Sequence, residues 1–139
     1  MKKEMENLKV SFNIKPEGSR PLVNYNLATG HIIFDVRMTL ERKARWVKAG
    51  HKNTIPEWSA FAGVVSRESV RIAFTYAALN GIPVCAAEIQ NAYLKAPASE
   101  KNYVICGPEF GLENIGKIAV IVHALYGGKS ANSDYWHHT

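Results

Sequence analysis

The sequence has few cysteines, few aspartates and no long hydrophobic run, and each shortage excludes a class of protein. Its two cysteines, Cys85 and Cys106, form no C-x-x-C pair, so they indicate neither a structural zinc site nor a redox motif. Two free buried thiols in a reducing compartment are the simpler interpretation, and a disulfide between them stays open.

Hydrophobic runs are too short for a membrane span. The longest strongly apolar run, Ile118 to Val122, falls far short of the ~20 residues that cross a bilayer. The N-terminal stretch MKKEMENLKVSF lacks the apolar core of a secretory signal peptide. We therefore expect an intracellular protein, in the cytoplasm or the nucleus, with no membrane partner.

Positive charge, by contrast, is in excess. The chain of 139 residues carries 17 Lys and Arg against 12 Asp and Glu, a net charge of +5. With 47% hydrophobic and 21% charged residues, its composition is that of one globular domain at most. The charge permits contact with the phosphates of nucleic acid, and it is equally compatible with a basic soluble protein that has no such partner.

The pattern along the chain changes near residue 30. Residues 1–30 are polar and interrupted by prolines and glycines, which predicts an irregular segment that only a neighbouring part of the structure could order. Residues 31–139 alternate between strand and helix patterns in the order β-β-α-β-β-β-α. That order predicts an α+β fold with a mixed, largely antiparallel sheet packed with helices. The expected strands are 32–38, 44–49, 84–89, 101–106 and 117–122, and the expected helices are 67–80 and a last one starting near Ser130.

The first two strands are expected to form a basic hairpin. Alternation over residues 32–38 predicts one buried face, and a polar turn leads into the second strand. Lys43 and Arg45 are two residues apart, so they share a face. Such a hairpin is often a solvated edge that discourages aggregation, and it also suits contact with phosphate.

The helix 67–80 has clear end signals. Ser66 stands at the N-cap position and Glu68 in the first turn, where a negative charge is favourable. Asn80 and Gly81 end the helix. Its apolar residues at helical spacing are Val70, Ala73, Phe74 and Ala77.

One acid, Glu88, stands in the apolar run VCAAEIQ. Strand alternation places Val84, Ala86 and Glu88 on the same face. Burial of an unpaired carboxylate is costly, so buried acids are paired, hydrogen-bonded or bound to a metal. A solvated residue at a strand end is one interpretation. A carboxylate aimed at a metal and a phosphate is the other.

Several runs in consistent order resemble the reverse transcriptase of copia-type long-terminal-repeat retrotransposons, a part of the Pol polyprotein. They are RKARWVKAGH, SAFAGVVSRESVRIAFTYAALNGIPVCAAEIQNAYL, YVICGPEF and ALYGGKSANSDYW. The resemblance implies the fingers and the first part of the palm of an RNA-directed DNA polymerase. It also implies two-metal nucleotidyl transfer with Mg²⁺, an RNA or DNA primer–template and deoxynucleotides as partners.

The resemblance assigns roles to particular residues. Glu88 stands where the family has its first catalytic aspartate and metal ligand. Tyr93 stands at the aromatic position under the incoming sugar, where its bulk would exclude a 2′-hydroxyl; a half-buried structural aromatic is the alternative. The backbone N–H groups of Ala92 and Tyr93 would face the triphosphate, and Lys43 and Arg45 are candidates for contacts with it.

A glycine-containing turn completes the predicted site. The run LYGGKS resembles the loop that lies against the template and the nascent base pair, and its matching residues are Gly127, Gly128, Lys129 and Ser130. Glycines allow a backbone to approach a base pair closely. On their own they mark only a turn.

The sequence departs from the family in two ways. Glu88 replaces an aspartate, and displacing a carboxylate by about one ångström lowers a rate by ~10²-fold. The later aromatic-x-Asp-Asp motif is absent, since the only aspartates are Asp35 and Asp134. We expect the thumb and ribonuclease H regions to be absent as well. We therefore expect at best weak Mg²⁺ binding at Glu88, and a truncated or degenerate polymerase domain that is inactive alone.

Two alternatives belong to other functional classes. One is a nucleic-acid-binding module that keeps the basic hairpin without catalysis. The other is a structural partner that completes a polymerase in trans, for which the aromatic residues Tyr135 and Trp136 are the sequence hint.

Overall fold

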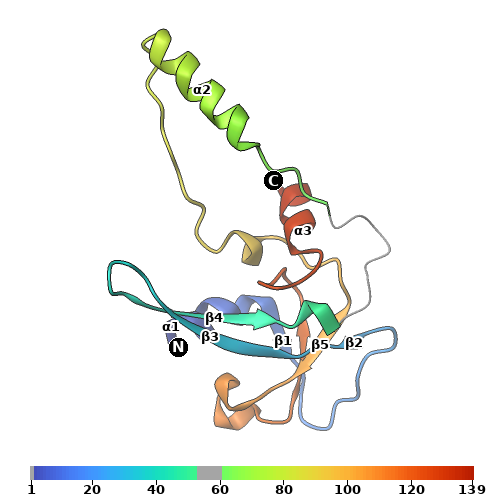
Figure 1. The fold of residues 1–139 in the computed structure, drawn as a ribbon. Coiled ribbons are helices and arrows are strands. Elements are labelled where there is room, and N and C mark those ends of the chain that lie inside the picture. The colour runs from blue at the N-terminus through green and yellow to red at the C-terminus, as the bar shows by residue number, and fades with distance from the viewer. Residues whose placement is uncertain (1, 53–60) are drawn as a thin grey trace.

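The computed structural model describes residues 2–52 and 61–139, which form three helices and six strands joined by short 3₁₀ turns (Figure 1). The predicted α+β class is confirmed. No helix among the described residues is long and apolar enough to cross a membrane. In chain order the elements are α1 (Lys2–Leu8), η1 (Lys9–Ser11), β1 (Phe12–Ile14), β2 (Asn26–Leu27), β3 (Gly30–Val36), β4 (Arg42–Lys48), η2 (Gly50–Lys52), α2 (Arg67–Leu79), η3 (Ala92–Lys95), β5 (Asn102–Ile105), η4 (Pro108–Phe110), η5 (Leu112–Asn114), β6 (Ile118–Ile121) and α3 (Ala131–His138).

The strands form two sheets. The larger has four strands in the order β1-β6-β5-β2, in which β6 runs antiparallel to both neighbours and β2 runs parallel to β5. The smaller is the antiparallel hairpin β3–β4, whose pairs run from Gly30 opposite Lys48 to Val36 opposite Arg42. The predicted hairpin and the strands expected near 101–106 and 117–122 are therefore confirmed.

The core is built around Trp46 of β4, which is 1% exposed. The Phe12 ring meets it edge-on with centroids 5.3 Å apart, and Phe110 meets Phe12 in the same way at 5.0 Å. Leu8 of α1 and Leu125 before α3 are buried in the same cluster. These contacts join the hairpin to the larger sheet, so they set the position of the hairpin's basic face.

The prediction that residues 1–30 are irregular is wrong. The segment contains α1, β1 and β2, and its strands pair with β6 and β5. Its few apolar residues, among them Leu8, Phe12 and Ala28, are too sparse to show a periodic pattern. All three are nevertheless buried in the core cluster. Long-range packing, rather than local propensity, orders this segment.

The predicted strand at 84–89 is also wrong. These residues carry no regular secondary structure, and every residue from Gly81 to Gln90 is exposed. A strand requires a neighbour to receive its backbone hydrogen bonds. No strand of the described residues lies beside this segment. The sequence VCAAEI has the apolar pattern of a strand, but no strand of the described residues pairs with it.

Helix α2 forms as predicted, but few of its side chains are buried. The Ser66 hydroxyl accepts a hydrogen bond from the Ser69 N–H at 3.0 Å, which confirms the N-cap. Figure 1 shows α2 standing away from the two sheets. Of the expected apolar face, only Ala77 is buried, and Phe74 is exposed. The capping signals are local, whereas burial requires a neighbouring element.

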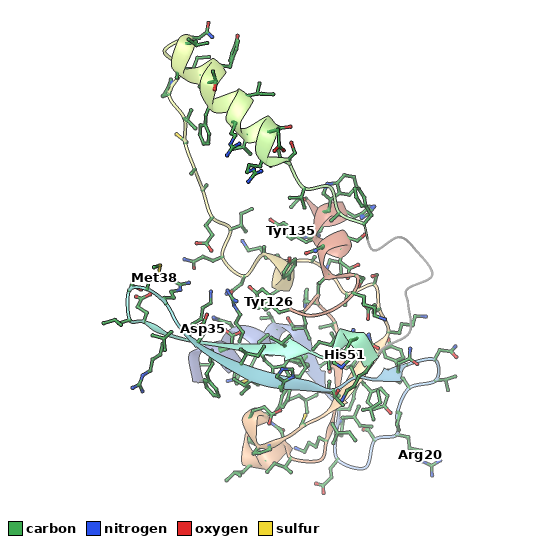
Figure 2. All side chains as sticks on the ribbon, in the orientation of Figure 1. Arg20, Asp35, Met38, His51, Tyr126 and Tyr135 are labelled. Atoms are coloured by element: carbon green, nitrogen blue, oxygen red, sulfur yellow. The ribbon has the colours of Figure 1, made fainter. Side chains whose placement is uncertain are left out.

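The hairpin extends beyond the core that covers its base. The face expected to be buried holds Ile32, which packs against the core, and Phe34 and Val36, which do not. Phe34 is 68% exposed, and Met38 at the tip is fully exposed and points away from the body (Figure 2). The prediction of a buried face therefore holds only at the base of the hairpin.

The two cysteines are free, and they differ in exposure. Cys106 follows β5 and is buried, and burial first and the charge of Glu109 second raise the pKa of its thiol. Cys85 is exposed because the segment around it forms no strand, so the expectation of two buried thiols is wrong for this one.

Candidate functional site

A cavity of about 790 Å³ lies beside the hairpin. Its volume is within the range of small-molecule sites. Three parts of the chain far apart in sequence line it: helix α1, the hairpin β3–β4 and the segment that contains Glu88. Tyr126, from the loop before α3, completes the lining. We call this cavity the basic cleft.

The cations of the cleft come from β4. Lys43 and Arg45 pair with Asp35 and Ile33 of β3, so they lie on one face of the hairpin, as predicted. Within residues 2–52 and 61–139, no carboxylate is within ion-pair distance of either cation. The Arg45 guanidinium lies 5.8 Å from the centre of the Tyr126 ring, a cation–π geometry that orients it. Both positive charges are thus available to an anion, and Tyr126 orients that of Arg45.

Glu88 lines the same cleft as Lys43 and Arg45. The structure therefore brings Glu88 to the same cavity as two cations that lie 43 and 45 positions before it in the sequence. Glu88 reaches the cleft from extended, exposed backbone, not from a strand. Its carboxylate is solvated, so no buried partner is required to hold its charge.

The donors around Glu88 are too few for a metal pair. Two-metal sites need several carboxylates because each ion takes hard oxygen ligands. Glu4 and Glu41 line the cleft too, but Glu41 is paired with Arg37 at 3.4 Å. Among the described residues, no group of three or more His, Cys, Asp or Glu side chains is placed to hold a metal ion. These residues do not fit a two-metal centre, and Mg²⁺ stays a prediction from the resemblance.

Tyr93 and Ala92 begin the short turn η3, next to the cleft rather than on its lining. The Tyr93 hydroxyl donates a hydrogen bond to the side-chain oxygen of Asn132 in α3. Its ring meets Tyr126 and Tyr135 edge-on, with centroids 5.2 and 6.2 Å apart. These contacts favour the alternative of a structural aromatic. The roles of Tyr93 in selecting the sugar and of the two backbone N–H groups stay predictions.

Tyr126 is the residue that sequence reasoning missed. It lies against both Arg45 and Tyr93, and so links the cleft to η3. Burial is the main cause that raises the pKa of its hydroxyl, followed by the negative charge of Glu4, while Arg45 acts in the opposite direction. The only sequence signal was its position in the run ALYGGK, directly before the paired glycines.

The glycine turn packs against the end of β4. The Lys48 N–H donates to the Tyr126 carbonyl at 2.8 Å, which joins the end of β4 to this turn. Gly127 has a φ of +82°, and a Cβ there would lie 2.2 Å from the Lys48 carbonyl oxygen. The close approach that the glycine allows is therefore to β4. Contact of the turn with a base pair stays a prediction.

Ser130 is only 3% exposed. It occupies the N-cap position of α3, as expected, but its hydroxyl donates to the Asp134 carboxylate at 2.8 Å instead of accepting a helix N–H. Its own N–H donates to Glu100 at 2.9 Å. Of the four predicted loop residues, Gly127 is exposed and Gly128 and Lys129 are partly exposed.

A buried ion pair links the end of β4 to the residues just before β5. The side chains of Lys48 and Glu100 are 4% and 11% exposed and form a salt bridge. Asn102 also donates to the Glu100 carboxylate at 2.8 Å. Burial alone would raise the pKa of Glu100, but the Lys48 ammonium and the Ser130 N–H outweigh it and hold this pKa at about 2, below the ordinary 4.5. The pair connects β4, β5 and the start of α3.

Comparison with known proteins finds no match among family models, curated proteins or solved structures. A function is therefore inferred from the sequence motifs and from the geometry of the basic cleft.

Proposed function

We propose that this chain is a nucleic-acid-binding module that resembles the fingers and early palm of a copia-type reverse transcriptase. Its hairpin β3–β4 binds the phosphates of a nucleotide or a primer–template, and the chain alone does not polymerise DNA. The proposal joins the resemblance of the motifs to the charge of the cleft.

One observation carries the binding part of the proposal. Lys43 and Arg45 lie on one face of the hairpin, line a cavity and have no carboxylate partner among the described residues. Arginine and lysine side chains bind phosphate through charge-assisted hydrogen bonds. An excess of unpaired cations in a cavity is the arrangement that a phosphate requires.

Replacing both cations tests the binding site. We expect Lys43→Gln with Arg45→Gln to weaken binding to a labelled RNA–DNA primer–template by about tenfold or more at low salt. Each lost phosphate contact lowers the slope of log affinity against log salt by about 1, so the double variant loses about 2. Fluorescence anisotropy at several salt concentrations measures both quantities.

The matched control removes two exposed cations elsewhere. Arg20→Gln with Lys101→Gln changes the net charge by the same amount, and Arg20 lies far from the hairpin tip (Figure 2). This control should retain the affinity and most of the salt slope. Equal losses in both double variants would mean that net charge alone, and not the cleft, attracts the nucleic acid.

We also expect the chain alone to be inactive as a DNA polymerase. Purified protein given a primed RNA template, Mg²⁺ and deoxynucleotides should extend the primer no further than a blank without protein. The reason is that Glu88 has, among the described residues, no group of carboxylate partners such as a pair of metal ions needs. Extension above the blank, abolished by Glu88→Gln, would contradict the prediction.

A structural partner that acts in trans is the second candidate. Exposed apolar side chains favour it, because large apolar surfaces commonly mark contact with another protein. On α2, Ile72, Phe74 and Leu79 are exposed, and so is Trp136 of α3. Tyr135, by contrast, packs against the small cluster of Ala96, Ala124 and Ala131 and is only partly exposed.

A further inference from the structure

We propose that helix α1 is an electrostatic gate on the basic cleft, in which the Glu4 carboxylate opposes the binding of an anion at Lys43 and Arg45. The inference rests on the proposed function, because it assigns a regulatory element to the same phosphate site.

Helix α1 is fixed against the body of the protein. Leu8 is fully buried, and Met5 packs against the same core cluster. Because Glu4 and Asn7 are three residues apart, they lie together on the flank of the helix next to this apolar side. Both line the basic cleft. Glu6 lies on the opposite side of the helix and is exposed.

The charges in the cleft nearly balance. Arg37 and Glu41 form an exposed ion pair with each other. Of the remaining charged residues on the lining, Arg42, Lys43 and Arg45 are positive, and Glu4 and Glu88 are negative. Among the described residues, the lining of the cleft therefore has an excess of one positive charge. Neutralising Glu4 raises that excess to two. A single side chain of α1 therefore strongly affects the electrostatic potential at the place where a phosphate would bind.

The charge of Glu4 acts across the cleft. Tyr126 lies on the wall formed by the loop before α3. Burial first, and Glu4 second, raise the pKa of its hydroxyl. No described carboxylate is within 4 Å of Lys43 or Arg45, so Glu4 repels an anion without occupying its place. The arrangement lowers affinity while leaving the cations accessible.

The test compares two isosteric changes on one helix. Binding of inorganic tripolyphosphate and of a deoxynucleoside triphosphate is measured by calorimetry in EDTA, at low and at high salt. Glu4→Gln should tighten binding of both ligands by about threefold to tenfold at low salt, and the gain should shrink as the Debye length falls. Glu6→Gln removes the same charge from the far side of α1 and should have little effect.

The outcomes separate this inference from the proposed function. Equal affinities for Glu4→Gln, Glu6→Gln and the unchanged protein, together with a loss on Lys43→Gln and Arg45→Gln, would overturn the gate and leave the phosphate site standing. Weaker binding of the nucleotide by Glu4→Gln would also overturn the gate, because Glu4 would then be a ligand contact. No binding of either ligand by any variant would overturn both.

Discussion

Replacing Glu100 by glutamine is expected to lower the free energy of unfolding by about 3–5 kcal/mol, because it leaves the buried Lys48 ammonium without its counter-charge. The Lys48 and Glu100 side chains are almost fully enclosed, and the carboxylate also accepts from Ser130 and Asn102. Urea denaturation at neutral pH, followed by tryptophan fluorescence, measures the change.

Two further variants separate the buried pair from charge in general. Glu41→Gln breaks the exposed pair with Arg37 and should cost less than about 1 kcal/mol. Combining Lys48→Met with Glu100→Gln removes both buried charges and should recover part of the loss. If Glu100→Gln and Glu41→Gln had equal effects, the buried pair would not stabilise the fold in the way described.

The same carboxylate makes stability depend on pH in acid. The pKa of Glu100 is about 2 in the folded protein against an ordinary 4.5, so its contribution is complete above pH 4.5. That contribution is lost as the pH falls from 4.5 towards 2, because the unfolded chain binds the proton more readily. The Glu100→Gln variant should lose less stability across this range than the unchanged protein does.

Replacing Gly127 by alanine is expected to destabilise the protein by about 2–5 kcal/mol, the sum of a backbone and a packing penalty. Its φ of +82° is unfavourable for alanine. The added Cβ would also lie 2.2 Å from the Lys48 carbonyl oxygen and 2.7 Å from a Val47 methyl. Denaturant unfolding measures the loss, and weaker phosphate binding should accompany it because β4 must shift.

Gly116→Ala is the matched control for this change. Gly116 has nearly the same φ, +80°, but nothing lies within 4 Å of the added Cβ. The control should therefore carry only the backbone penalty, about 1–2 kcal/mol. Similar losses in the two variants would show that the approach of Gly127 to β4 contributes nothing.

The candidate site was predictable where it depends on local pattern. Alternation along β4 is enough to place Lys43 and Arg45 on one face, and the register of the hairpin confirms it. Their proximity to Glu88 followed only from the resemblance to a polymerase. The structure places Glu88 on the same cleft, although the strand expected to carry it does not form.

Other parts of the site were not accessible from sequence, since they depend on contacts between distant segments. Tyr126 is positioned by contacts with Arg45 of β4 and Tyr93 of η3. Glu4 lies on a helix that no periodic pattern in the sequence predicted. It lines the cleft because the buried Leu8 holds that helix against the core. A sequence pattern of a few residues carries no information about such neighbours.

The sequence by itself determined the α+β class, the hairpin, the capped start of α2 and the strands β5 and β6, because each depends on propensities and spacings within about ten residues. Only the tertiary structure decided that residues 1–30 join the core, that 84–89 stay unpaired and that the apolar face of α2 is exposed. The physical reason is that burial and strand pairing require a partner, and a partner distant in sequence leaves no mark on the local pattern.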